Sequence, residues 1–280
     1  MDSFATNAQK SFHIRSNSLP SKPHPVVDEV DEHLCRLKAC EATSSSSSLC
    51  QKLDGLQDLH DCIEKLLVLP LTHQAIVDNK SVDELLEGSL KLLDLCTMAK
   101  DMISQMKECA HELESSLRRR RGDDIVVDVQ KYMNSRKMMK KAIHKALKGM
   151  ERTSSQKSNE NSEIVSLLKE TEAVTYSTIE SLLSFLAGPK LASKMNRWSL
   201  VSKLMQSKRV ACKDGNEVEM VDAALYSIIN HKFDILVQGE DVQNSLKKLE
   251  LCIRDIEEDL ESLYRRLIKN RVAFLNILNY

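Results

Sequence analysis

The chain has 280 residues, a net charge of −1 and 42% hydrophobic residues, so it can bury a sizeable core and carries no global field that would attract nucleic acid. Aromatic residues (4%), glycine (7) and proline (5) are scarce, which favours helices over strands. The N-terminus lacks an apolar signal segment, and the longest apolar runs, such as Leu66–Leu71, are too short to cross a bilayer. We therefore expect a cytoplasmic protein that is neither secreted nor transmembrane.

Residues 1–25 are predicted to form a disordered tail. They are rich in Ser and Asn, and Pro20, Pro23 and Pro25 exclude a helix and favour an extended path. We expect one helical-bundle domain over residues 26–280. Its first helix is predicted over 26–41.

A serine-rich loop, Thr43–Ser48, is expected to follow the first helix. The second helix is predicted over 50–69. It should end before Pro70, because the residue before a proline is disfavoured in the α conformation.

The next predicted helix, over 81–121, begins with a capping box in which Ser81 is followed three residues later by Glu84. Its apolar residues alternate in steps of three and four, which is a heptad seam. At about 1.5 Å per residue this helix would be about 60 Å long. The seam positions are Val82, Leu85, Ser89, Leu92, Cys96, Ala99, Ile103, Met106, Ala110, Leu113 and Leu117.

The last predicted helix, over 240–278, has a second seam with the same spacing. Its positions are Val242, Leu246, Leu249, Ile253, Ile256, Leu260, Leu263, Leu267, Asn270, Phe274 and Ile277. Between the two seams we expect weaker helices over 124–149, 160–187, 190–209 and 216–238, with a polar loop over 153–162. Glycines commonly end helices, and five of the seven lie at predicted helix borders: Gly122, Gly149, Gly188, Gly215 and Gly239.

The fold class predicted from these patterns is all-α, an antiparallel helical bundle built on the two long heptad-patterned helices. The alternative is an intermolecular coiled coil. The apolar faces of the intervening helices favour the intramolecular arrangement.

No specific catalytic motif is present: the chain has no P-loop, no dinucleotide-binding glycine pattern, no nucleophile elbow and no His-Glu-x-x-His. None of the eight cysteines forms a Cys-x-x-Cys pair, and most occupy apolar helical positions, where a reduced cysteine acts as a small hydrophobic residue. We therefore expect no enzyme, no metal site and no cofactor.

The strongest local charge runs from Arg118 to Lys148, where eleven cations face three acids, a balance of +8. Interleaved apolar residues make its second part a basic amphipathic helix, which could bind an anionic membrane, calmodulin or an acidic protein. A solvated face that balances acidic stretches elsewhere is the alternative. The residues predicted for an anionic surface are Arg118, Arg119, Arg120, Arg121, Arg136, Lys137, Lys140, Lys141, Lys145 and Lys148.

The tail contains a second candidate site. Arg15 precedes Ser18 by three residues, Ser16 lies between them, and Pro20 follows Ser18 by two residues. A phosphate on Ser18 would add nearly two negative charges, and 14-3-3 proteins recognise such a pattern through an arginine cluster. The alternative is a chance match in a tail with no such role.

Four stretches resemble a plant-specific family, the BYPASS-related proteins that contain plant domain of unknown function 241. The stretches are Phe12–Pro25, Ser181–Pro189, Trp198–Met205 and Leu263–Lys269 continuing to Leu278. The resemblance implies a plant origin, a non-enzymatic helical protein and a role in root and shoot development. It supplies no catalytic residue and no cofactor.

Our leading hypothesis is a helical interaction protein in plant development whose tail docks a partner under control of phosphorylation. The second hypothesis is a peripheral membrane protein that binds anionic lipid through Arg118–Lys148. An enzyme is a distant third, and nucleic acid is disfavoured because the basic segment has almost no aromatic residues.

Overall fold

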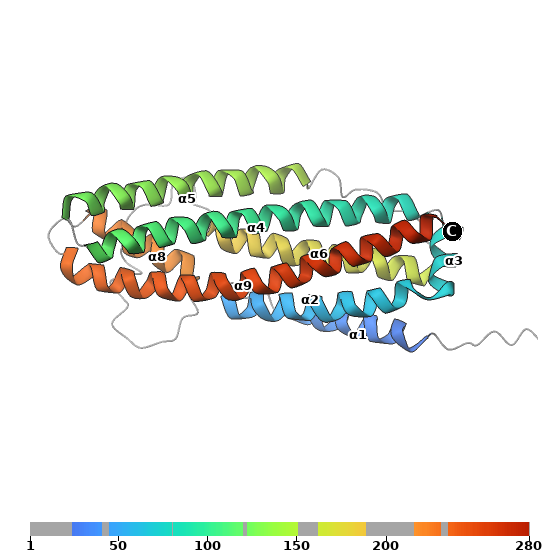
Figure 1. Cartoon of the computed structure of the whole chain (residues 1–280). Helices are drawn as coiled ribbons and strands as arrows, with labels where there is room; N and C mark the ends of the chain where they lie inside the picture. Colours follow the sequence, from blue (N-terminus) through green and yellow to red (C-terminus); the bar gives the residue numbers. More distant parts are fainter. Residues whose placement is uncertain are drawn as a thin grey trace, which may run out of the picture.

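All described elements of the computed structural model are α-helices, most of them long and aligned along one axis (Figure 1). The predicted all-α class is confirmed for the part of the chain that is described. The tail up to residue 23 and the helix predicted over 190–209 lie outside it. The described residues are 24–40, 45–79, 81–119, 122–150, 162–188, 216–230 and 235–279.

The first two helices begin at residues that commonly start helices. Helix α1, Pro25–Ala39, has a proline at its first position, where the missing N–H costs nothing. Helix α2, Ser46–Leu67, starts four residues before the predicted position 50, because the Ser45 hydroxyl accepts a hydrogen bond from the Ser48 N–H. Three of the serines assigned to a loop therefore form the first turn of a helix.

Helix α3, Pro70–Asp78, is absent from the sequence prediction. Pro70 ends α2, as expected, but it also stands at the first position of the next helix. There its fixed φ favours helix and its lost donor is irrelevant. Because Pro70 was interpreted only as the end of α2, the short helix that it begins was not predicted.

The two long helices are α4, Val82–Arg119, and α9, Ile235–Leu278. Every residue of both predicted seams is buried. The helices run antiparallel, since Arg271 of α9 donates to the Leu86 carbonyl near the start of α4, and Lys107 near its end pairs with Glu257. The prediction of an antiparallel bundle is therefore confirmed.

Shorter helices complete the bundle: α5, Gly122–Met150; α6, Glu163–Ala187; and α8, Glu217–Asn230. Helix α8 ends eight residues earlier than predicted, and α9 already begins at Ile235. Gly239 therefore lies inside α9, and its prediction as a helix border is wrong, since one glycine costs a helix only about 1 kcal/mol. Among the described glycines only Gly188 has a positive φ, 69°, at the end of α6.

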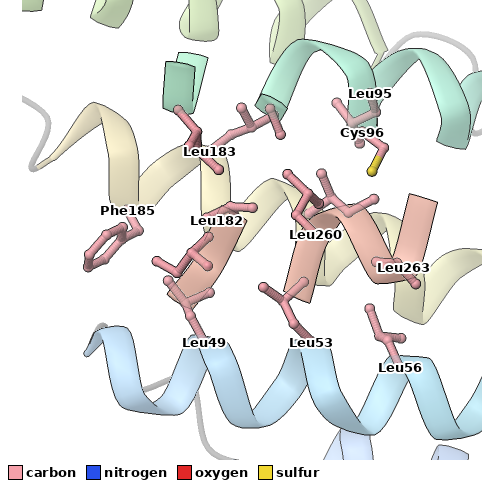
Figure 2. Close-up of a cluster of buried hydrophobic side chains, with 14 of the residues drawn as sticks. Leu49, Leu53, Leu56, Leu95, Cys96, Leu182, Leu183, Phe185, Leu260 and Leu263 are labelled. Atoms are coloured by element: carbon pink, nitrogen blue, oxygen red, sulfur yellow. The ribbon is translucent and has the colours of Figure 1, made fainter. Parts of the chain in front are cut away.

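The core lies where α2, α4, α6 and α9 converge. Figure 2 shows Leu49, Leu53 and Leu56 of α2 facing Leu260 and Leu263 of α9, with α6 and α4 closing the other sides. Helices α2 and α9 run parallel, because Asp61 pairs with Arg266 and, one turn further along both, Glu64 pairs with Lys269.

One polar cluster interrupts this core. The imidazole of His60, in α2, lies 2.9 Å from the Thr175 hydroxyl of α6 and 2.8 Å from the Asn270 amide nitrogen of α9. The Thr175 hydroxyl donates to the Thr171 carbonyl, so it accepts from the imidazole, whose other nitrogen accepts from Asn270. The geometry fits a neutral His60 that links three helices at one level.

Candidate interaction surfaces

The arginine cluster at the end of α4 is only partly described. Arg118 is exposed and donates to Glu114 at 2.7 Å, and Arg119 donates to the Ser115 carbonyl at 3.1 Å. Both interactions are local to the last turns of α4, where positive charge stabilises the helix dipole. Arg120 and Arg121 lie outside the described residues.

Arg136 does not belong to the surface on which the sequence placed it. It is 1% exposed, and its guanidinium donates two hydrogen bonds of 3.2 Å to the Asp222 carboxylate of α8. A third, of 2.8 Å, reaches the Leu186 carbonyl. The spacing of Arg136 from the buried Tyr132 and Met139 places it on the inner side of α5, but no local pattern identifies the acid that neutralises it, which is 86 residues away.

Two further residues, Lys140 and Asn216, lie with Arg136 at the end of α6. Lys140 also binds Asp222, at 3.3 Å, and is therefore turned away from the exposed side of α5. Asn216 donates to the Phe185 carbonyl at 3.1 Å and accepts from the Val218 N–H, so it joins the end of α6 to the start of α8. The last carbonyls of α6, which no helical N–H can reach, are thus satisfied from α5 and α8.

The remaining four predicted cations of α5 share one exposed face. Lys137, Lys141, Lys145 and Lys148 are all exposed. Their spacing of four, four and three residues keeps them on one side of the helix. We call these four residues the α5 lysine face.

The predicted docking segment, with Arg15, Ser16, Ser18 and Pro20, lies outside the described residues. Its place on the molecule therefore rests on sequence alone.

A second surface, which was not predicted from the sequence, lies at the C-terminal end of α9. Ile268, Val272, Leu275 and Leu278 are between 39% and 51% exposed, although they are apolar. We call these four residues the α9 stripe. Their spacing of four, three and three residues is typical of one face of a helix. The seam of the same helix, with Leu267 and Phe274, already explains why α9 forms, so the second apolar face was not singled out.

The surroundings of the α9 stripe are basic and apolar. Arg265 lies one turn before it, and no acid occurs between Ser262 and Asn279. Val68, which is 71% exposed, follows Glu64 by one turn of α2, and the Glu64–Lys269 pair places it at the same end of the bundle. α3 and the end of α9 lie at the same end of the bundle in Figure 1.

The described part of the chain offers little to a small ligand. A cavity between α4 and α5, beside Tyr132, has a volume of about 20 Å³, which is room for one water. No group of three or more His, Cys, Asp or Glu among the described residues could hold a metal ion. Within the same ranges, no helix combines the length and the apolar character that a bilayer span requires.

The described cysteines are reduced, and three of the seven are buried. Burial raises the pKa of Cys96 to about 12 and that of Cys252 to about 12, so both thiols stay protonated. Both side chains belong to the hydrophobic core.

Comparison with known proteins identifies a protein family. A family model described as Protein BPS1 matches residues 52–277, which is 226 of the 280 residues. No curated protein and no solved structure matches the chain. The matched range extends from α2 to the end of α9, so it takes in the α5 lysine face and most of the α9 stripe.

Proposed function

Because the chain belongs to the BPS1 protein family, we propose that it is a non-enzymatic helical interaction protein in plant root and shoot development. The developmental role is what the family resemblance implies. The observation that carries the interaction role is the α9 stripe, four apolar side chains on one exposed face of a helix.

The size and spacing of the α9 stripe suit one kind of partner. From Ile268 to Leu278 the stripe extends about 15 Å along α9, or nearly three turns. A partner helix with apolar residues at similar spacing would bury these side chains. Apolar surface buried in this way contributes roughly 25 cal/mol per Å².

The charged residues beside the α9 stripe indicate which residues should border the apolar face of the partner helix. Arg265 and Lys269 border the stripe, where they pair with Glu261 and Glu64 of the bundle, and the last turns of α9 have no acid of their own. A partner helix with acidic residues beside its apolar face would be steered to this end of the bundle and held in register. We therefore propose an acidic, amphipathic helix of another protein as the occupant.

The test compares Val272→Asp/Leu275→Asp with Leu251→Asp, a control that introduces a single Asp at another exposed apolar position of α9. In plant cells, proximity labelling with each variant should yield a helical, acidic partner that the double variant loses and the control retains. A peptide of the partner's helix should then bind the purified wild-type chain at least tenfold more tightly than the double variant.

Two outcomes would contradict this proposal. Equal peptide binding by the double variant and the wild type would remove the stripe from the interface. If sedimentation instead detects a dimer of the wild-type chain that the double variant cannot form, the stripe serves self-association.

We also propose that the tail is a docking segment controlled by phosphorylation of Ser18. The support is the sequence alone, with Arg15 three residues before Ser18 and Pro20 two residues after it. A 14-3-3 pull-down should recover the Ser18-phosphorylated chain and not a Ser18→Ala version. Equal recovery of the two would end this part of the proposal and leave the α9 stripe untouched.

A further inference from the structure

The α5 lysine face points directly away from the bundle. At about 100° per residue, its four lysines fall within an arc of about 80° on α5. The buried residues of the same helix, Val129, Met139 and Ile143, lie on the opposite side. Helix α5 forms one edge of the bundle in Figure 1, so nothing in the described part of the chain covers this face.

The charge of this face is not neutralised within the described part of the chain. Lys137, Lys141, Lys145 and Lys148 make no ion pair there, and α5 has no acid after Asp128. The other cations of the helix are engaged: Lys131 binds Glu112 at 2.8 Å, and Lys140 shares Asp222 with the buried Arg136. The fold has thus separated cations that stabilise the bundle from cations that it leaves in solvent.

Two exposed apolar side chains lie on the same side of α5, Met138 beside the lysines and Val127 about 15 Å before the first of them. Val127 and Met138 are each 63% exposed. By helical spacing Val127 lies in line with Lys145, and Met138 lies at the edge of the same arc. Lysines flanked by apolar side chains are typical of a helix that lies on a membrane, because the ammonium groups meet lipid headgroups while the apolar groups enter the interface.

From these observations we infer that the α5 lysine face docks the protein on an anionic membrane surface. Calmodulin is disfavoured, because it would have to enclose the apolar side of α5, and the fold already buries Met139 and Ile143 there. An acidic protein surface without apolar groups would match only the lysines, whereas an anionic membrane also accommodates the exposed Met138 beside them. Four lysines on one helix predict weak, reversible binding that salt weakens.

The experiment is flotation of the full chain with vesicles of phosphatidylcholine, with and without about 30% phosphatidylserine. The test variant replaces Lys137, Lys141, Lys145 and Lys148 with Gln. A matched pair of double variants compares Lys141→Gln/Lys145→Gln with the control Lys247→Gln/Lys248→Gln, whose lysines are exposed on α9 and make no ion pair in the described part of the chain. Each of these double variants loses two unpaired positive charges, so the position of the charges is the difference between them.

We expect the wild type and the control to float with the anionic vesicles only, and the test variant to bind at least about tenfold less. Raising the salt from about 0.1 M to about 0.5 M should release the bound protein. Met138→Gln should weaken binding severalfold in low salt without changing its salt dependence. The α9 stripe takes no part in this proposal, so the Val272→Asp/Leu275→Asp variant should float like the wild type.

Three results would overturn the proposal. Equal flotation of the two double variants would show that position on α5 does not matter. Flotation with neutral vesicles to the same extent would remove the electrostatic basis. Failure of the wild type to float, together with retention on a polyglutamate column that the test variant loses, would assign the face to an acidic protein.

Discussion

At the scale of single residues, the bundle contains polar groups whose partners are distant in sequence. Arg136 meets Asp222 across 86 residues, and His60 meets Asn270 across 210. The concentration of positive charge in Arg118–Lys148 placed Arg136 with the exposed lysines, although its spacing from Tyr132 and Met139 puts it on the buried side of α5. Once buried, each group must be hydrogen-bonded, since an unpaired buried charge costs several kcal/mol.

His60 gives a prediction for pH. Burial, followed by the nearby Arg266 guanidinium, lowers its pKa from 6.5 to about 4. The unfolded chain therefore binds a proton between these values while the folded chain does not, so folding stability falls as the pH drops below 6.5. Between pH 7 and pH 5, His60 should remove about 2 kcal/mol of the free energy of unfolding.

Urea denaturation at pH 7 and pH 5 measures this effect. His60→Gln cannot titrate, so its stability should fall by about 2 kcal/mol less than that of the wild type over the same pH change. The matched control is His111→Gln, at an exposed position of α4, which should keep the wild-type pH dependence. An identical pH dependence in His60→Gln and the wild type would show that His60 is not held neutral by the fold.

At the scale of elements, helix ends were harder to predict than helices. Ser45 caps a helix that was predicted to start later, and Pro70 begins a helix that was not predicted. Gly239 was predicted at a helix border but lies inside α9. Each signal has two meanings: a serine can belong to a loop or cap a helix, and a proline can end one helix and begin another. Packing against the bundle selects between them, because it stabilises any turn that can bury an apolar face.

Gly188 is the glycine whose role as a helix border the backbone confirms. Its φ of 69° and ψ of −179° lie in a region that other residues hardly adopt. A β-carbon at Gly188 would stay at ordinary distances from Lys140 and Arg136, so Gly188→Ala should be destabilising through backbone strain, by about 1–3 kcal/mol.

Gly149→Ala is the matched control. Gly149 is helical, and a β-carbon there would meet nothing within 4 Å. Thermal unfolding should show Gly149→Ala equal to or more stable than the wild type, by up to about 1 kcal/mol. If Gly188→Ala were as stable as Gly149→Ala, the end of α6 would not require its left-handed conformation.

At the scale of the whole molecule, the antiparallel pair of α4 and α9 is the frame onto which the other helices pack. Helix α9 contacts α2, α4 and α8, so helices from both halves of the chain share one core. This arrangement predicts that a cavity at the centre weakens the entire bundle and not one helix alone.

Leu260→Ala tests that prediction. Leu260 is fully buried between α2, α4 and α6 (Figure 2). Its truncation should lower the free energy of unfolding by about 2–5 kcal/mol and shift the urea transition without splitting it. Leu251→Ala, on the exposed side of α9, should change stability by less than about 0.5 kcal/mol. A two-step transition in Leu260→Ala would mean that the helices do not share one cooperative core.

The sequence by itself determined the helical class, the two buried seams and their residues, because periodic burial of apolar side chains is a local property that one helix reveals. Tertiary structure decided which cations are free. Arg136 and Lys140 lie on the side of α5 that faces the bundle, whereas Lys137 and Lys141 lie on the side that faces solvent, and Asp222 of α8 pairs with the first two. Tertiary structure also decided that the last turns of α9 have a second, exposed apolar face. Helices α2 and α4 cover the seam of α9 and leave the α9 stripe exposed. The sequence of α9 alone does not show which of its two apolar faces will pack against another helix.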